Sequence, residues 1–227
     1  MILTQITTIN CKLHKAGVNM GDVYYTVANN IRREDKIKKC KFITSIKNVT
    51  SKAQAEEFIK QVSEKYSDAT HNVPAYKIGF GDQAKKGCSD DGEPSGSSGP
   101  PALQALEGKN LTNVAVVVTR YFGGIKHGVG GLVRAYGDSV REAIKEAGII
   151  KKERYVKLAV EISYDLMGQV INDLEGKSAQ IKETNYTNQG VEIIALMKPG
   201  LISEFKSRIT DATRGEAVFE LKGDEFF

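Results

Sequence analysis

The chain has 227 residues, of which 41% are hydrophobic and 26% are charged, which is enough for one large domain or two small ones. It contains no apolar run of about 18 residues, which excludes a membrane-spanning helix. Its first residues, MILTQITTINCKLHKAG, lack the apolar stretch and cleavage site of a secretory signal. The net charge of +4 permits an anionic partner, but dedicated nucleic-acid-binding domains are usually more basic.

The cysteines indicate the redox compartment. Cys11, Cys40 and Cys88 stand far apart and form neither a C-x-x-C pair nor a zinc-ligand spacing with histidine. We therefore predict reduced thiols in a cytoplasmic protein, with no structural metal and no cofactor.

The first elements are an extension and two strands. Residues 1–22 carry no sustained hydrophobic period, and we interpret them as an N-terminal extension, with Met1 and Met20 as alternative starts. The β-branched and aromatic run 23–27 predicts a strand, and alternation over 40–49 predicts another.

A helix follows, with a clear start signal. Ser51 and Gln54 have the spacing of a capping box, and apolar residues then recur at helical intervals. We predict a strand over 72–80, a loop over 81–100, where apolar residues are almost absent, and a short helix over 101–106. A loop of that length in a compact domain is usually functional or disordered.

The centre of the chain combines a buried strand, a glycine-rich loop and a helix. Residues 114–118 form a continuous β-branched run, which is typical of a strand covered on both faces. The sequence GGIKHGVGG follows, and a helix with one broad apolar face then runs to Gly148.

The C-terminal part predicts the order β-α-β-β-α-β, which is that of a ferredoxin-like domain. We place the domain boundary near 151–155, where the charged residues 151–154 predict a solvated linker. This divides the chain into an extension (1–22), an N-terminal domain (23–150) and a C-terminal domain (156–227). The fold class is α+β, with no solenoid repeat.

The glycine-rich loop is suited to an anion. A helix N-terminus presents unpaired N–H groups, and Arg120, Lys126 and Arg134 lie around it in sequence. The loop matches neither a Walker A motif nor a dinucleotide fingerprint. The alternative is that the glycines serve only a tight turn and close helix–sheet packing.

The acidic segment has two interpretations. Asp90, Asp91 and Glu93 are suitable ligands for Mg²⁺, with His71 as a general acid or base. Carboxylates in a turn-rich segment more often cap turns or pair with arginine, and a single histidine more often has a structural role. We assign no metal site and no confident catalytic residue, and no nucleophile motif appears.

Together these segments closely resemble the YigZ/IMPACT family. The resemblance rests on a signature loop and on two glycine-rich stretches, RYFGGIK and GVGGLVRAY, at 120–126 and 128–136. The signature loop consists of Asp90, Asp91, Gly92, Glu93, Pro94, Ser95 and Gly96. The family often has Thr-Ala where this chain has Ser97-Ser98, and Leu in place of His127, which adds a polar group at the loop tip.

The resemblance implies more than the residues alone do. It implies an N-terminal domain like the second domain of a small-subunit ribosomal protein, and a C-terminal domain similar to the last domain of elongation factor G. Both of these act on RNA. Eukaryotic members restrain a kinase that controls translation initiation, but they do so with an additional domain, so kinase regulation is not implied here.

We therefore expect a non-enzymatic protein that binds RNA or ribosomal components and regulates translation. The residues expected at the anion or nucleic-acid site are Arg120, Gly123, Gly124, Lys126, His127, Gly128, Gly130, Gly131 and Arg134. Two alternatives stay open. One is a metal-assisted hydrolase that uses Asp90, Asp91, Glu93 and His71, and the other is a protein-interaction module.

Overall fold

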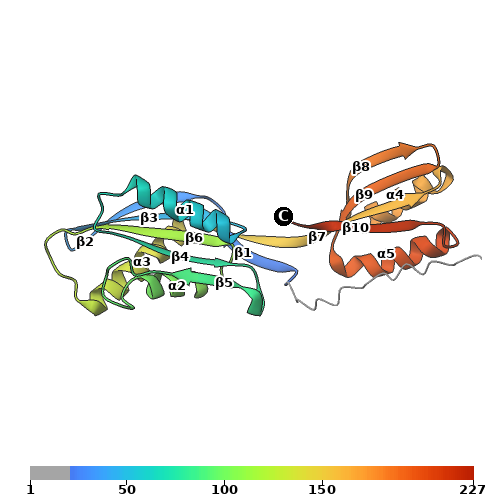
Figure 1. Ribbon diagram of the computed structural model, residues 1–227. Coiled ribbons are helices and arrows are strands. Elements are labelled where there is room, and N and C mark those ends of the chain that lie inside the picture. The colour runs from blue at the N-terminus through green and yellow to red at the C-terminus, as the bar shows by residue number, and fades with distance from the viewer. Residues whose placement is uncertain (1–20) are drawn as a thin grey trace, which may run out of the picture.

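The computed structural model describes residues 21–227 and consists of two lobes in a row, joined by one long strand (Figure 1). The predicted extension and the choice between Met1 and Met20 concern residues that lie almost entirely outside this part of the chain. No helix within the described residues is both long enough and apolar enough to cross a membrane.

The N-terminal lobe is built on a five-stranded antiparallel sheet with the order β2-β3-β6-β4-β5. Its strands are β2 (Ile31–Ile37), β3 (Cys40–Asn48), β4 (His71–Ile78), β5 (Lys85–Cys88) and β6 (Val114–Tyr121). The central strand β6 confirms the sequence prediction, because residues 114–118 are fully buried and are covered on both faces.

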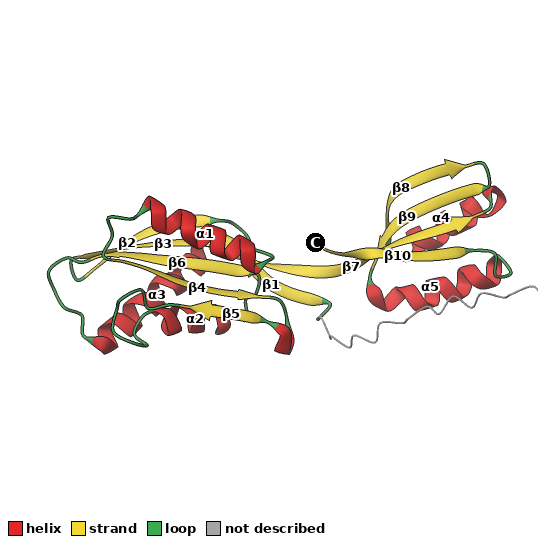
Figure 2. Cartoon of the chain, in the orientation of Figure 1, coloured by secondary structure: helices red, strands yellow, loops and turns green. Residues whose placement is uncertain are grey.

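Helices cover both faces of this sheet (Figure 2). The helix α1 (Lys52–Lys65) packs on one face, and α2 (Gly99–Glu107) and α3 (Val129–Ala147) pack on the other. Ser51 caps α1 as predicted, because its side chain accepts a hydrogen bond from the Gln54 N–H at 3.2 Å.

The C-terminal lobe has the predicted β-α-β-β-α-β order. Its elements are β7 (Ile149–Ile162), α4 (Met167–Gly176), β8 (Gln180–Thr187), β9 (Gly190–Met197), α5 (Pro199–Ala212) and β10 (Val218–Phe226). The strands form an antiparallel sheet in the order β10-β7-β9-β8, and a short 3-10 helix, Tyr164–Leu166, precedes α4. The α+β class and the ferredoxin-like lobe are thus confirmed.

Two local predictions were wrong, and one strand was not predicted. Residues 151–154 are not a linker but part of β7, where 151–153 pair with β1 (Val23–Val27) and Arg154 pairs with β10. The segment 81–100 is not all loop, since it contains a 3-10 turn (Gly81–Gln83) and β5. The charged edge strand β2 was missed, because only its two end residues are apolar.

Candidate functional site

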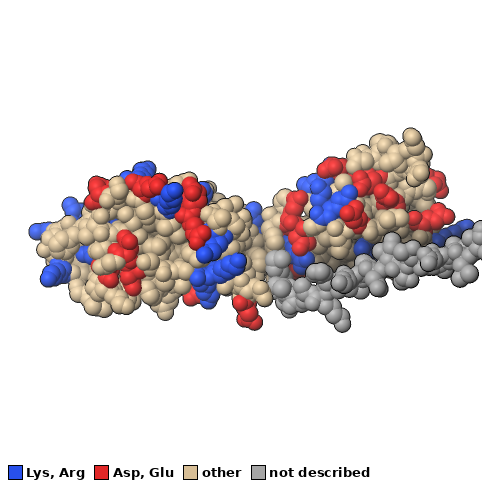
Figure 3. All heavy atoms as spheres, viewed as in Figure 1, with Lys and Arg blue, Asp and Glu red and all other residues tan. Residues whose placement is uncertain are grey.

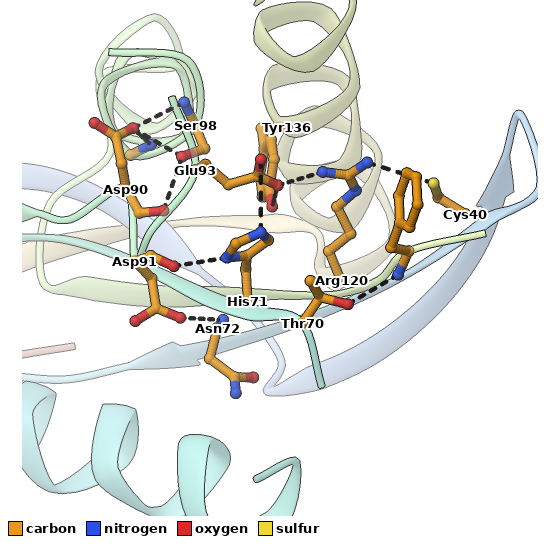
Figure 4. Close-up of polar contacts among 12 residues, drawn as sticks. Cys40, Thr70, His71, Asn72, Asp90, Asp91, Glu93, Ser98, Arg120 and Tyr136 are labelled. Atoms are coloured by element: carbon orange, nitrogen blue, oxygen red, sulfur yellow. Dashed lines mark hydrogen bonds and ion pairs between the residues drawn. The ribbon is translucent and has the colours of Figure 1, made fainter. Parts of the chain in front are cut away.

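The acidic signature loop and the end of β6 meet in the N-terminal lobe, although they are far apart in sequence (Figure 4). Glu93 lies at the centre. Its Oε1 accepts hydrogen bonds from Arg120 Nη1 at 2.6 Å and from the Tyr136 hydroxyl at 2.7 Å. The side chains of Glu93 and Arg120 are only 3% and 6% exposed. The two sequence motifs therefore form one buried polar network.

Asp90 organises the backbone of the same loop. Its carboxylate accepts hydrogen bonds from the N–H groups of Gly96, Ser98 and Gly99 at 2.7–2.9 Å, and from the Ser98 hydroxyl at 2.7 Å. Burial alone would raise the pKa of Asp90, but these hydrogen bonds outweigh burial and lower the pKa. Ser98 does not cap α2 with its own side chain, so Asp90 takes the capping role.

Asp91 and His71 join the loop to β4. The Asp91 carboxylate accepts a hydrogen bond from the Asn72 N–H at 2.5 Å. His71 Nδ1 lies 2.7 Å from the Asp91 carbonyl oxygen, so this nitrogen carries the proton. His71 Nε2 lies 3.7 Å from Glu93 Oε2. The histidine thus links the exposed and buried parts of the signature loop.

This geometry does not support the hydrolase alternative. Asp90, Asp91 and Glu93 each accept hydrogen bonds from different protein donors, and these bonds occupy the carboxylates that would have to face a shared cation. Within residues 21–227, no group of three or more His, Cys, Asp or Glu side chains has the arrangement of a metal site. The residue types suggested metal chemistry, whereas their orientation is that of loop and helix caps.

Arg120 is not exposed at the glycine-rich loop as the sequence predicted. It was expected among the cations around the glycine-rich loop, but it is buried beside Glu93, and its Nη2 also donates to the Cys40 sulfur at 3.5 Å. Burial acts to lower the pKa of Arg120, but hydrogen bonds to Cys40 and Glu93 outweigh burial and raise the pKa. Arg120 is therefore a buried structural cation and does not face solvent.

The glycines of the loop are explained by different local features. A side chain on Gly123 would place its Cβ 1.9 Å from the Lys39 carbonyl oxygen, so the loop packs tightly against the β2–β3 turn. Gly124 and Gly128 have φ values of 85° and 70°, in the left-handed region that favours glycine. At Gly130, in the first turn of α3, a Cβ would meet no atom within 4 Å, so packing does not explain this glycine.

His127 and Gly131 lie at the foot of α3. The His127 ring stacks on Phe42, with 5.9 Å between centroids, and so does not form the polar loop tip that the sequence suggested. Both ring nitrogens are buried, and neither makes a hydrogen bond of standard geometry within the described residues. Burial first, and the charge of Arg120 second, lower the pKa of His127. A Cβ on Gly131 would lie 3.2 Å from that of His127.

Four exposed cations and one exposed aromatic residue lie in and beside the loop, and we call this group the basic tip. It comprises Lys38, Lys39, Phe122, Lys126 and Arg134. None of its four cations makes an ion pair with residues 21–227. The Phe122 ring is 48% exposed and has the Arg120 guanidinium 5.6 Å from its centroid. In Figure 3, Lys and Arg atoms lie at the left end of the molecule, where Figure 1 places the β2–β3 turn and the loop before α3.

Of the basic tip, Lys126 and Arg134 were predicted from the sequence, whereas the other three members were not. Lys38 and Lys39 form the β2–β3 turn with φ values of 46° and 68°. The dipeptide would have been recognised as a hairpin turn only if β2 had been predicted.

The open sheet face of the C-terminal lobe has a different character. Core residues alternate along β7 and β9, so Ala159, Glu161, Glu192 and Ile194 lie on the face away from α4 and α5. Open four-stranded sheets that bind RNA stack bases on aromatic residues of their central strands. These four positions carry two carboxylates and two buried aliphatic side chains, whereas Tyr155, on the same face of β7, packs on Phe227.

Comparisons with known proteins agree with this architecture. Residues 38–144 match the Impact N-terminal domain, and residues 160–216 match a domain of unknown function, DUF1949. The chain is 36% identical over 194 residues to "IMPACT family member YvyE" of Bacillus subtilis, covering 86% of this chain and 88% of that protein. It is 31% identical over 183 residues to "IMPACT family member YigZ" of Escherichia coli, covering 80% and 89%.

A crystal structure described as that of "an hypothetical protein" matches with a TM-score of 0.63 and 29% identity, over 87% of this chain and 96% of the other. The mouse "Protein IMPACT" is 42% identical over only 65 residues, which are 28% of this chain and 20% of that protein. The signature loop, the order of the elements and these matches agree, and the chain belongs to the IMPACT family.

Proposed function

We propose that the protein binds RNA, free or within the ribosome, through the basic tip. The observation that carries this proposal is the group of four exposed cations without carboxylate partners in residues 21–227, placed around an exposed phenylalanine. Phosphate groups attract such cations, and nucleic-acid bases stack on exposed aromatic rings.

The start of α3 adds to this surface. Lys126 precedes the helix, and Gly130 leaves the first turn open to a close approach by a phosphate. The partial positive charge of a helix N-terminus favours an anion there. The Glu93–Arg120 pair is buried beneath the surface and stabilises the loop from the protein interior. In this proposal the buried network positions the loop, and the tip makes the contact.

The family resemblance supports the same partner class, because the two implied domain relatives act on RNA. A role in regulating translation, in the cytoplasm, follows from that resemblance and belongs to this proposal.

Fluorescence anisotropy with a labelled single-stranded RNA tests the proposal. With about 0.7 counterions released per single-strand phosphate contact, four contacts give a slope of log affinity against log salt near −2.8. The double variant Lys126→Ala/Arg134→Ala should reduce that slope by about 1.4. The control is Lys85→Ala/Lys109→Ala, which removes two exposed lysines that make no ion pair within the described residues.

A slope that does not change in the tip variant, or that falls equally in the control, contradicts the proposal. Binding that is insensitive to salt contradicts it as well.

One specific observation favours the alternative of a protein-interaction module. The edge strand β8 carries Tyr186, which is 65% exposed and stacks on Tyr164, with 6.3 Å between centroids. Exposed strand edges and aromatic residues are common features of protein interfaces. If Tyr186→Ala abolishes cosedimentation with purified ribosomes and the tip variant does not, protein contact is the better description.

A further inference from the structure

A second site lies at the other end of the N-terminal lobe, where β1, the end of β4 and the end of β10 meet. It is a pocket of about 550 Å³. Its lining residues carry no formal charge and are Tyr24, Thr50, Gly79, Phe80, Gln83, Asn113 and Phe226. Small-molecule sites of about 300–1,000 Å³ are usually mostly apolar, with a few placed polar groups.

Three aromatic rings from three separate segments of the chain line this pocket. The centroid of Tyr24 lies 5.0 Å from that of Phe80 and 5.0 Å from that of Phe226. The Phe80 and Phe226 rings are stacked at 5.7 Å. A cluster of this kind offers ring faces and edges to a further planar ring. The absence of charge among the lining residues favours a neutral ring over a phosphate.

Asn113 supplies the polar group. It is 7% exposed, and its Oδ1 accepts a hydrogen bond from the Gly79 N–H at 3.0 Å, which fixes the orientation of the amide. Its Nδ2 donates no hydrogen bond to any atom of residues 21–227. Its backbone is held too, because the Asn113 carbonyl accepts from Thr26, Asn48 and Val49. The Asn113 amide therefore has a fixed donor that is open to solvent at the pocket.

We propose that this pocket binds a planar, neutral heteroaromatic ring with a hydrogen-bond acceptor on its edge, the chemistry of a nucleobase. The ring packs against Tyr24, Phe80 and Phe226, and Asn113 Nδ2 donates to its edge. The inference does not rest on the basic tip. β6 begins at the pocket and ends at the glycine-rich loop, so its length separates the two sites by about 23 Å.

The test is a titration of the full chain with adenosine and with cytidine, followed by NMR of the Asn113 side-chain amide. We expect saturable shifts of that amide. Asn113→Asp is the matched variant, because Asp keeps the acceptor for Gly79, tolerates the φ of 55° and removes the donor. The affinity of both proteins is followed through the backbone amide of Gly79, which is present in each. We expect affinity to fall about tenfold or more in Asn113→Asp, because the Asp carboxylate would then face the acceptor on the ring.

Phe226→Ala should also weaken binding, whereas Phe227→Ala should not, because Phe227 packs on Tyr155 and does not line the pocket. No shift of the Asn113 amide in the wild type, or equal affinity in Asn113→Asp, overturns the inference.

A parallel titration with single-stranded RNA distinguishes binding of a free nucleoside from binding of a base within a strand. If the free nucleoside shifts Asn113 but RNA does not, the pocket takes a free ligand. If RNA also shifts it, the pocket takes a base of the strand. Nucleoside binding should persist in Lys126→Ala/Arg134→Ala, so failure of the tip and failure of the pocket are distinguishable.

Discussion

Substituting Glu93 tests whether the most specific sequence motif is structural. Glu93→Gln keeps the shape of the side chain but removes the charge opposite Arg120. Because the two side chains are 3% and 6% exposed, water cannot replace that charge. Breaking a buried pair by removing one partner costs ~3–5 kcal/mol. The amide oxygen can still accept from Arg120 and Tyr136, so we expect the lower end, about 3 kcal/mol.

Urea unfolding followed by circular dichroism measures this change. With a slope of about 2 kcal/mol/M, the midpoint of the N-terminal lobe should fall by roughly 1.5 M. Glu146→Gln is the control, since Glu146 pairs with Arg33 at 2.9 Å but its side chain is 47% exposed. That exposed pair should contribute under about 1 kcal/mol.

A double-mutant cycle with Arg120→Met completes the test. Once Glu93 is already Gln, the loss of Arg120 should cost less, because no uncompensated charge then stays buried. If Glu93→Gln is as stable as the wild type, or if the two substitutions are additive, the description of a buried ion pair is wrong.

Two further predictions concern the loops. Asp90→Asn should destabilise the start of α2 by about 1–2 kcal/mol at neutral pH. Because the folded pKa of Asp90 is lowered, the wild-type advantage is present above the unfolded value of about 3.9 and is lost as the pH falls further, which denaturation at several pH values measures. A constant difference at every pH would contradict this. Gly123→Ala should lower the Tm because its Cβ meets the Lys39 carbonyl, whereas Gly130→Ala should raise it slightly. Equal changes in Tm for the two variants would show that the contact with the Lys39 carbonyl does not destabilise Gly123→Ala.

Regular hydrophobic patterns made the fold largely predictable from the sequence. The buried run of β6 and the apolar face of α3 each follow one period, and the C-terminal lobe alternates strands and helices clearly. Residues 151–154 are charged yet form a strand, because their backbone groups find partners in β1 and β10. That pairing involves segments at opposite ends of the described chain and leaves no local signal.

The site was harder to predict, for a similar reason. An arginine next to glycines suggests a surface cation, and only its partner 27 residues earlier in the chain shows that Arg120 is buried. The carboxylates of the signature loop suggested metal ligands, but the N–H groups that satisfy them belong to a turn whose shape the sequence does not specify. Residue types identified where the chemistry lies, whereas the direction of each side chain decided what it does.

The shared strand β7 has a mechanical consequence for the whole molecule. Its 14 residues span about 43 Å, and the same strand pairs with β1 at one end and with β9 and β10 at the other. Arg154 bridges Asp22 and Asp224 between these partners. The two lobes are therefore joined through one continuous strand and the Arg154 ion pairs, and the partner of β7 changes from β1 to β10 between residues 153 and 154. A large partner that touches both lobes would meet two surfaces connected through this paired strand.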